Sequence, residues 1–160
     1  MINLLTKIAD KSVNCIKIAV LIFMIIMCIV VFANTAGRFL FNKSIPWSPE
    51  ISRFAFIWIT FLGTAVAVWE KSNAKVEVLT EKFSGNLKTF LMILRYIVIN
   101  IISLLLIYTG IKQVLIIWPT CASYLRFLSI GWIYLSIPIC GIFIFLFSLI
   151  YLWKLVKGII

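Results

Sequence analysis

Long apolar runs separated by short polar stretches divide this 160-residue chain into four segments. Charged residues lie near the ends of these runs, and each run has roughly the 20 residues that a helix needs to cross the hydrocarbon core of a bilayer. The pattern predicts membrane spans at about residues 18–41, 49–69, 89–111 and 129–153. We therefore expect an all-α membrane protein in which residues 1–160 form a single domain of four transmembrane helices.

The first span follows a basic stretch, which is also how a secretory signal peptide begins. Lys7, Lys11 and Lys17 precede an apolar run from Ile18 to Ala33 that continues to about Phe41. The run is too long for a signal peptide, and no small-x-small cleavage site follows it. We expect a membrane-spanning helix here.

The second span has the most sharply defined start. Ser48 is suited to the N-cap position, and Pro49 and Glu50 follow it in the first turn. Proline lacks only a donor that has no partner there, and a carboxylate is favourable at the positive end of a helix. We expect the helix to begin at Pro49 and to reach Trp69, a length of roughly 31 Å.

A polar connection separates the second span from the third. Within it Ser84-Gly85-Asn86 predicts a turn, and Val76, Val78 and Leu79 predict a short interfacial segment. In the fourth span Pro138 removes a backbone donor, so we expect it to kink that helix or to be accommodated by a neighbouring one.

The distribution of basic residues predicts the orientation in the membrane. If the N-terminus is cytoplasmic, nine basic residues flank the spans on the cytoplasmic side and five on the outer side. This excess predicts that both termini are cytoplasmic. The inner set is Lys7, Lys11, Lys17, Lys71, Lys75, Lys82, Lys88, Lys154 and Lys157, and the outer set is Arg38, Lys43, Arg53, Lys112 and Arg126.

Composition supports a membrane protein and excludes a water-soluble one. Hydrophobic residues make up 64% of the chain, charged residues 12%, and the mean hydropathy is +1.16. The net charge of +10 would also suit a nucleic-acid-binding protein, but the basic residues flank apolar runs instead of covering one polar face. We expect no nucleic-acid partner, and we expect phospholipid contacts with Trp47 and Trp132 at headgroup depth.

Few side chains are available for catalysis or for binding a cofactor. The chain has no histidine, and its four cysteines have no CxxC or metal-ligand spacing. Its five acidic residues lie at termini or in loops, and no serine or cysteine has an evident activating base. We therefore predict no catalytic residue, no cofactor and no metal site, and we disfavour a membrane enzyme or a haem-containing redox subunit.

Charged side chains gather at the outer junction between the first two spans. Arg38 lies near the end of the first span, and Glu50 and Arg53 lie three residues apart at the start of the second. An unpaired arginine at membrane depth costs about 2–3 kcal/mol, so a carboxylate partner is favourable. One interpretation is a network that sets the angle between the two helices; the other is a solvated rim of unrelated charges.

Small residues on one stripe of the second span indicate packing against another helix. Ala55, Gly63 and Ala67 share this stripe with Ile59. Small side chains let a second helix backbone approach closely in a membrane. We expect Gly63 to lie at such a contact, either within the chain or with another subunit.

An ordered set of residues resembles the small membrane subunit (DctQ-like) of tripartite ATP-independent periplasmic (TRAP) transporters. The likeness extends from Arg38 to Gly141. Two positions, Asn73 and Gly131, depart from the family pattern. The matching residues are Arg38-Phe-Leu-Phe-Asn, Pro46-Trp47-Ser48, Glu50, Arg53, Trp58, Phe61-Leu62-Gly63, Ser123, Leu128, Trp132, Tyr134 and Ile137-Pro138-Ile139-Cys140-Gly141.

The resemblance implies an accessory role in the bacterial cytoplasmic (inner) membrane. Such a subunit forms a heterodimer with a large permease subunit that carries the solute and sodium sites, and helps a periplasmic substrate-binding protein to dock transiently. The family takes up acids such as dicarboxylates or sialic acids by secondary active transport. By position, Arg38, Glu50 and Arg53 would order the outer helix junction. Trp47, Trp58 and Tyr134 would contact the large subunit, headgroups or the binding protein.

A self-contained four-helix exporter acting as a homodimer is the alternative function. Such an exporter needs an ionisable group at membrane depth to exchange its substrate for a proton. The four predicted spans carry no aspartate or glutamate in their interiors. The pattern therefore favours the accessory subunit.

Overall fold

The computed structural model describes residues 2–70, 86–121, 124 and 129–156. These residues form α1 (Ile2–Phe41), α2 (Ser48–Trp69), α4 (Asn86–Ile117), α5 (Gly131–Tyr134) and α6 (Ser136–Val156). Four helical stretches are long and apolar enough to cross a membrane, namely Thr6–Phe41, Ser48–Trp69, Phe90–Ile117 and Gly131–Leu155. The predicted all-α fold class with four spanning helices is confirmed.

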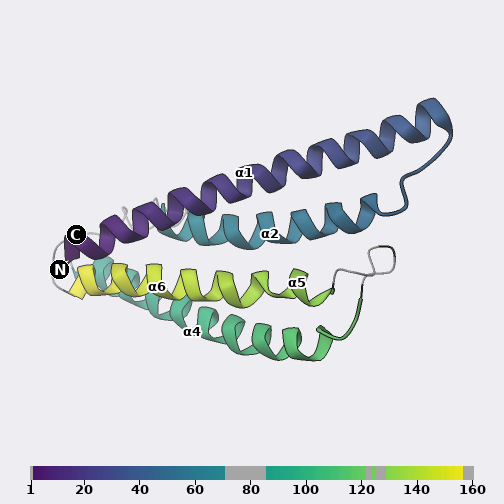
Figure 1. Cartoon of the computed structure of the whole chain (residues 1–160). Coiled ribbons are helices and arrows are strands. Elements are labelled where there is room, and N and C mark those ends of the chain that lie inside the picture. Colours follow the sequence, from purple (N-terminus) through teal and green to yellow (C-terminus); the bar gives the residue numbers. More distant parts are fainter. Residues whose placement is uncertain (1, 71–85, 122–123, 125–128, 157–160) are drawn as a thin grey trace.

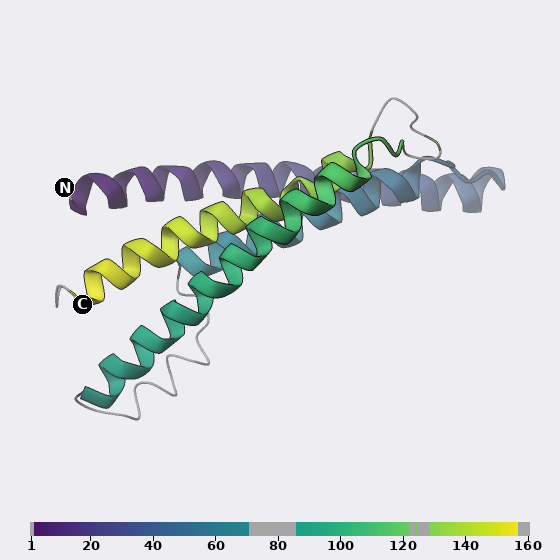
Figure 2. The same ribbon diagram turned by 90° about the horizontal axis from the view of Figure 1, so that it is seen from below.

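The helices form two hairpins that meet along α2 and α6 (Figure 1). In one hairpin α1 packs along α2, and in the other α4 packs along α6. Helix α1 begins and α6 ends at the same end of the bundle (Figure 1). Toward the opposite end α1 diverges from α6, and α4 crosses α6 at an angle (Figure 2).

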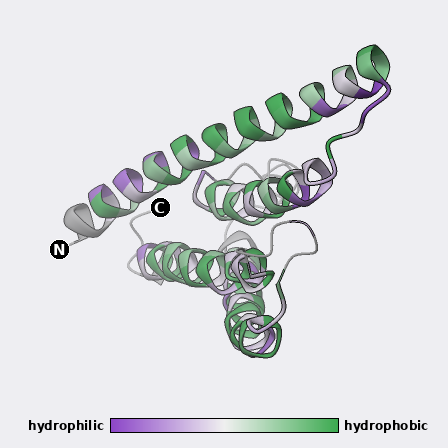
Figure 3. Cartoon of the chain, turned by 45° about the vertical axis from the view of Figure 1, so that its right-hand side comes forward, coloured by the Kyte–Doolittle hydropathy of each residue, from purple (hydrophilic) through white to green (hydrophobic). Residues whose placement is uncertain are grey.

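Apolar side chains cover most of the outer surface (Figure 3). Ile18, Phe32 and Leu115, for example, are 61%, 77% and 71% exposed. Such a surface would aggregate in water but is favourable in contact with lipid tails. Polar residues gather at the beginning of α1 and at its turn into α2 (Figure 3).

Helix α1 begins well before the predicted span at residue 18. The earlier part is amphipathic: Ala9, Val13 and Ile16 are buried, whereas Lys7 and Lys11 are exposed. Spacings of four and three residues place the buried side chains on one face of a helix. The predicted span began too late because the lysines before residue 18 interrupt the apolar run, although they lie on the exposed face of the same helix.

The turn from α1 into α2 is held by two hydrogen bonds to residues near the end of α1. Asn42 adopts a left-handed backbone conformation with φ 51°, which asparagine tolerates better than most residues. The Lys43 N–H donates to the Gly37 carbonyl oxygen at 3.3 Å, and the Ile45 N–H donates to Asn34 Oδ1 at 2.8 Å. These bonds reverse the chain within a few residues.

The predicted capping role of Ser48 is wrong. The N-cap of α2 is Trp47, no side chain caps the helix, and Ser48 is the first helical residue. Ser48 is buried against α1, where its hydroxyl donates to the Val30 carbonyl oxygen at 3.4 Å. The Ser48 hydroxyl therefore links α2 to α1 and does not cap the free N–H groups at the start of α2.

The fourth span consists of two helices separated by a turn at Leu135. Pro138 has no N–H to donate to the carbonyl of Tyr134, the residue at which α5 ends. Since Pro138 lies in the first turn of α6, where an N–H has no partner within the helix, its missing donor lowers the stability of α6 little. The predicted kink is thus a break just before α6.

Two glycines bring α4 and α6 into close contact. A Cβ atom on Gly110 would lie 2.7 Å from Pro138 Cδ, and one on Gly141 would lie 2.9 Å from Ile107 Cγ1 and 3.1 Å from the Ser103 carbonyl oxygen. Glycine at these positions allows the backbones to approach closely. Pro138 is therefore also accommodated by the neighbouring helix α4, which was the second of the two outcomes that the sequence predicted for it.

Polar bonds add to this packing. Asn100 Nδ2 of α4 donates to Ser148 Oγ of α6 at 2.9 Å, and Ser148 Oγ donates to the Tyr96 carbonyl oxygen at 3.2 Å. In a membrane such interhelical bonds contribute about 0.6 kcal/mol each on average. They fix the register of α4 against α6.

Helix α4 extends beyond the predicted end at residue 111 to Ile117. Lys112 lies within it, with Nζ 5.1 Å from the centre of the Tyr108 ring. A long lysine side chain reaches polar surroundings from inside a helix, so one lysine does not end a span. The predicted interfacial segment at Val76, Val78 and Leu79, the turn at Ser84-Gly85, and Asn73 lie outside the described residues.

Candidate functional site

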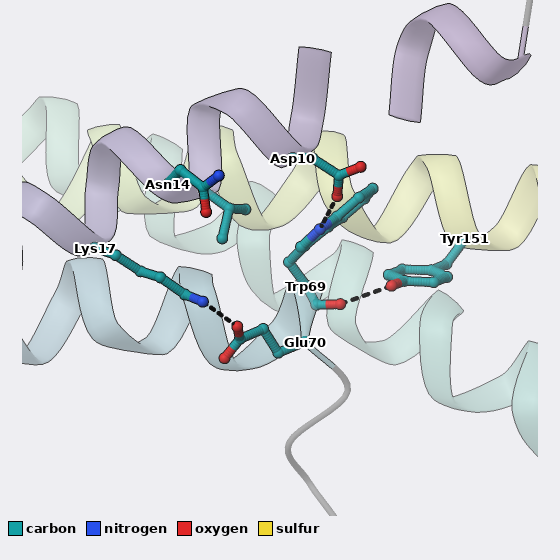
Figure 4. A pocket seen from close by; sticks show the side chains of 7 residues that line it. Asp10, Asn14, Lys17, Trp69, Glu70 and Tyr151 are labelled. Atoms are coloured by element: carbon teal, nitrogen blue, oxygen red, sulfur yellow. Dashed lines mark hydrogen bonds and ion pairs between the residues drawn. The ribbon is translucent and has the colours of Figure 1, made fainter. Parts of the chain in front are cut away.

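A polar groove lies where the first part of α1 meets the ends of α2 and α6 (Figure 4). Its volume is about 730 Å³. Three charged side chains line it. Its lining residues are Asp10, Val13, Asn14, Lys17, Trp69, Glu70 and Tyr151.

Trp69 is the residue that connects the three helices at this groove. Its indole Nε1 donates to Asp10 Oδ1 of α1 at 2.9 Å, and its carbonyl oxygen accepts a bond from the Tyr151 hydroxyl of α6 at 2.6 Å. Its ring centre lies 5.1 Å from those of Phe147 and Tyr151. Because Trp69 is the last residue of α2, its carbonyl has no partner within the helix, and Tyr151 supplies one.

An ion pair between Lys17 and Glu70 closes one side of the groove (Figure 4). The two side chains are 47% and 43% exposed, so the pair contributes only about 0–1 kcal/mol to stability. Lys17 is the last charged residue before the long apolar part of α1, and Glu70 directly follows the last residue of α2. The pair therefore marks the boundary between the polar and apolar parts of the bundle.

Sequence reasoning placed Asp10 and Glu70 among unconnected terminal and loop charges and so missed this groove. A usable signal was present. Lys17 and Glu70 each adjoin the apolar part of a helix, and consecutive spans joined by a short connection are antiparallel. Opposite charges at matching depth on antiparallel neighbours are expected to meet.

At the opposite end of the bundle Glu50 bonds to Tyr124, which lies between α4 and α5 in the sequence. The Tyr124 N–H lies 3.1 Å from Glu50 Oε1 and 3.3 Å from Oε2, and so donates to the carboxylate. Glu50 thus joins the start of α2 to a residue far along the sequence.

The predicted network of Arg38, Glu50 and Arg53 is not formed among these three side chains. Arg38 and Arg53 are exposed, and neither makes an ion pair with a residue that the structure describes. The choice between a network and a solvated rim of unrelated charges stays a prediction. Among the residues that the structure describes, Glu50 is the one of the three that bonds to a distant part of the chain.

The predicted aromatic contacts have different environments. The Trp58 ring stacks on Phe23 of α1 with centres 5.8 Å apart, so it packs within the chain. Trp47 and Trp132 are exposed, and the Trp132 ring lies 6.0 Å from Trp118. Tyr134 is partly buried at the end of α5.

Gly63 does not support a close helix contact within the chain. A Cβ atom built there meets nothing within 4 Å. Gly63 instead lines a second, apolar groove of about 260 Å³ between α1 and α2. The residues that do allow close approach are Gly110 and Gly141, neither of which the stripe argument identified.

The arrangement offers no evident chemistry. Within the described ranges no group of three or more His, Cys, Asp or Glu side chains could hold a metal ion. Asp10 and Glu70 each bond to a neighbouring helix or side chain. The polar groups of the groove hold α1, the end of α2 and α6 together.

Comparison with known proteins indicates a family. Residues 27–158 match the family described as Tripartite ATP-independent periplasmic transporters, DctQ component. A Haemophilus influenzae protein, provisionally named a TRAP transporter small permease protein, is 37% identical over 82 residues, which are 51% of this chain and 49% of that protein. Another protein of the same species and name is 25% identical over 149 residues, covering 91% of this chain and 88% of that protein. The chain spans about half the length of the first relative and most of the second.

Proposed function

Because the chain belongs to the DctQ family of TRAP transporter components and is a multi-pass protein of the bacterial inner membrane, we propose that it is the small accessory subunit of a TRAP transporter. It pairs with a large permease subunit and widens the static part of the complex. The large subunit carries out sodium-driven uptake of a carboxylate-containing solute that a periplasmic binding protein delivers. The match over residues 27–158 carries this proposal.

The distribution of charge supports an accessory role. Asp10, Glu50 and Glu70 lie toward the ends of the apolar part of the bundle, and no described carboxylate lies in the middle of a span. Solute or ion exchange within these helices would need an ionisable group at that depth. The chain therefore contributes contact surface to the complex, and the large permease subunit binds and transports the solute.

The orientation that we propose places both termini in the cytoplasm. Nine basic residues against five favour it, and the α1 start and the α6 end lie at one end of the bundle (Figure 1). The turn between α1 and α2 and the connection after α4 then face the periplasm. Trp47, Tyr124 and Trp132 are exposed at that end, where a binding protein would dock.

Co-expression with the large subunit tests the proposal. We expect a tagged form of this chain to purify with the large subunit, and vesicles containing both to take up solute when the binding protein and a sodium gradient are supplied. Vesicles with either subunit alone should show none. Full uptake by the large subunit alone would refute an accessory role. Substrate-dependent cation exchange by this chain alone would support a self-contained exporter instead.

Replacing Glu50 with alanine should lower uptake about fivefold, because the Tyr124 N–H loses its charged acceptor and the outer connection is released. Glu50→Gln keeps an oxygen acceptor and should retain most activity. The matched control is Arg53→Ala on the same helix, since Arg53 has no ion-pair partner among the residues described. Uptake assays at constant complex yield measure the effect. Equal losses in Glu50→Ala and Arg53→Ala would contradict this role of the bond.

A further inference from the structure

The two grooves described above share one residue. Lys17 lines both the polar groove of about 730 Å³ and the apolar groove of about 260 Å³. Beyond Lys17 the apolar groove is lined by Val20, Leu21, Met24, Gly63 and Val66. The surface between α1 and α2 therefore changes from polar to apolar at a single lysine.

Helical spacing shows that the two grooves follow one seam. On α1 the lining positions are 10, 13, 14, 17, 20, 21 and 24, which recur every three or four residues and form one stripe. On α2 the positions 63, 66 and 69, together with Glu70 directly after the helix, do the same in the opposite direction. A molecule lying along this seam would meet charged groups at one end and aliphatic side chains at the other.

Along the seam the polar and apolar groups follow each other in the same order as the headgroup and the acyl chains of a lipid. Lys17 directly precedes the long apolar part of α1, and the apolar groove lies on the membrane side of it. Headgroups occupy the polar boundary and acyl chains the region beyond it. A soluble ligand would leave the apolar groove empty, whereas an amphiphile would fill both.

Charge selects among the headgroups. The polar groove has two carboxylates, Asp10 and Glu70, and one ammonium, Lys17, so an anionic headgroup would be repelled. A phosphate suits Lys17, which is 47% exposed and has room for an acceptor besides Glu70. A primary ammonium donates three hydrogen bonds, which Asp10 and the Asn14 amide oxygen would accept, whereas a quaternary ammonium donates none.

We propose that the α1–α2 seam binds one phospholipid whose headgroup is a zwitterion with a primary amine. The phosphate lies at Lys17, the ammonium lies between Asp10 and Asn14, and an acyl chain follows the groove past Gly63. The bound lipid fills a gap that the protein leaves between two helices. This inference does not require the large subunit.

Native mass spectrometry of the full chain released from detergent micelles tests the site. With added phosphatidylethanolamine we expect one lipid bound per chain, and about tenfold weaker binding of phosphatidylglycerol. Lys17→Ala should weaken phosphatidylethanolamine binding about tenfold, whereas Lys11→Ala, an exposed lysine of the same helix outside both grooves, should leave it unchanged.

A second pair of variants tests the acyl groove without changing charge. Gly63→Leu places a side chain in the open groove and should weaken phosphatidylethanolamine binding about tenfold, as Lys17→Ala does. Thr64→Leu adds a leucine at the next, exposed position and should not. Thermal unfolding without added lipid confirms that all variants are folded.

Four outcomes would overturn the proposal. Equal binding of the two lipids would remove the headgroup assignment, and unchanged binding in Lys17→Ala or Gly63→Leu would place the lipid elsewhere. Dimers of the chain that bind no lipid, and whose yield falls with Gly63→Leu, would show that a second copy fills the seam. Loss of binding in Lys11→Ala to the same extent would indicate only general attraction between charges and lipid.

Discussion

Gly110→Leu is expected to destabilise the protein by about 3 kcal/mol, because the added side chain has no space against α6. Even a Cβ atom at this position would lie 2.7 Å from Pro138 Cδ and 2.9 Å from Pro138 N. The proline ring is rigid and its nitrogen is backbone, so neither yields without moving α6. Thermal unfolding in detergent should show a melting temperature roughly 10 °C lower, and Gly110→Ala should show a smaller decrease.

Gly63→Leu is the matched control, since it makes the same substitution in another spanning helix. A side chain there meets open space, so the melting temperature should stay within a few degrees of the unsubstituted protein. If the two leucine variants unfold at the same temperature, the contact between α4 and α6 is looser than described above.

Trp69→Ala should cost about 3 kcal/mol and loosen three helices at once. The substitution removes the ring contacts with Phe147 and Tyr151 and the hydrogen bond to Asp10, and leaves a cavity where the side chain was 8% exposed. The melting temperature in detergent measures the loss. Cysteine cross-linking between α1 and α2 should become less specific as the end of α2 detaches.

Two further variants separate the contributions of Trp69. Trp69→Phe keeps most of the ring packing but loses the donor to Asp10, so the expected cost is about 1–2 kcal/mol. Trp132→Ala removes an indole that is 47% exposed and lies beside the Trp118 ring, and should cost only about 1 kcal/mol. Similar losses in Trp69→Ala and Trp132→Ala would contradict the connecting role of Trp69.

The sequence predicted the number of spans and their approximate positions because bilayer thickness imposes a length that can be counted. The start of α2 was predicted to within one residue, since Pro49 and Glu50 favour a first turn. The start of α1 and the end of α4 were predicted less well. Lysines interrupt the apolar runs there, but helix formation depends on backbone bonding and on which face a lysine occupies.

Interactions between spans were largely beyond prediction from the sequence. The hydroxyl of Ser48 was assigned to its own helix, but the structure directs it to Val30 of α1. Gly63 and Gly110 look alike in the sequence, and only the position of Pro138 on a neighbouring helix distinguishes them. Local patterns specify helices, whereas contacts depend on the rotation and crossing of each pair.

The length of α1 has a mechanical consequence. Forty residues of continuous helix measure about 60 Å, roughly twice the hydrocarbon thickness, and no proline interrupts it. A rod of this length meets a thicker or thinner bilayer by changing its inclination. The part of α1 that carries Asp10 and the turn that leads from α1 to Glu50 lie toward opposite ends of this rod, so a change in its inclination would move the polar surfaces at the two ends of the bundle together.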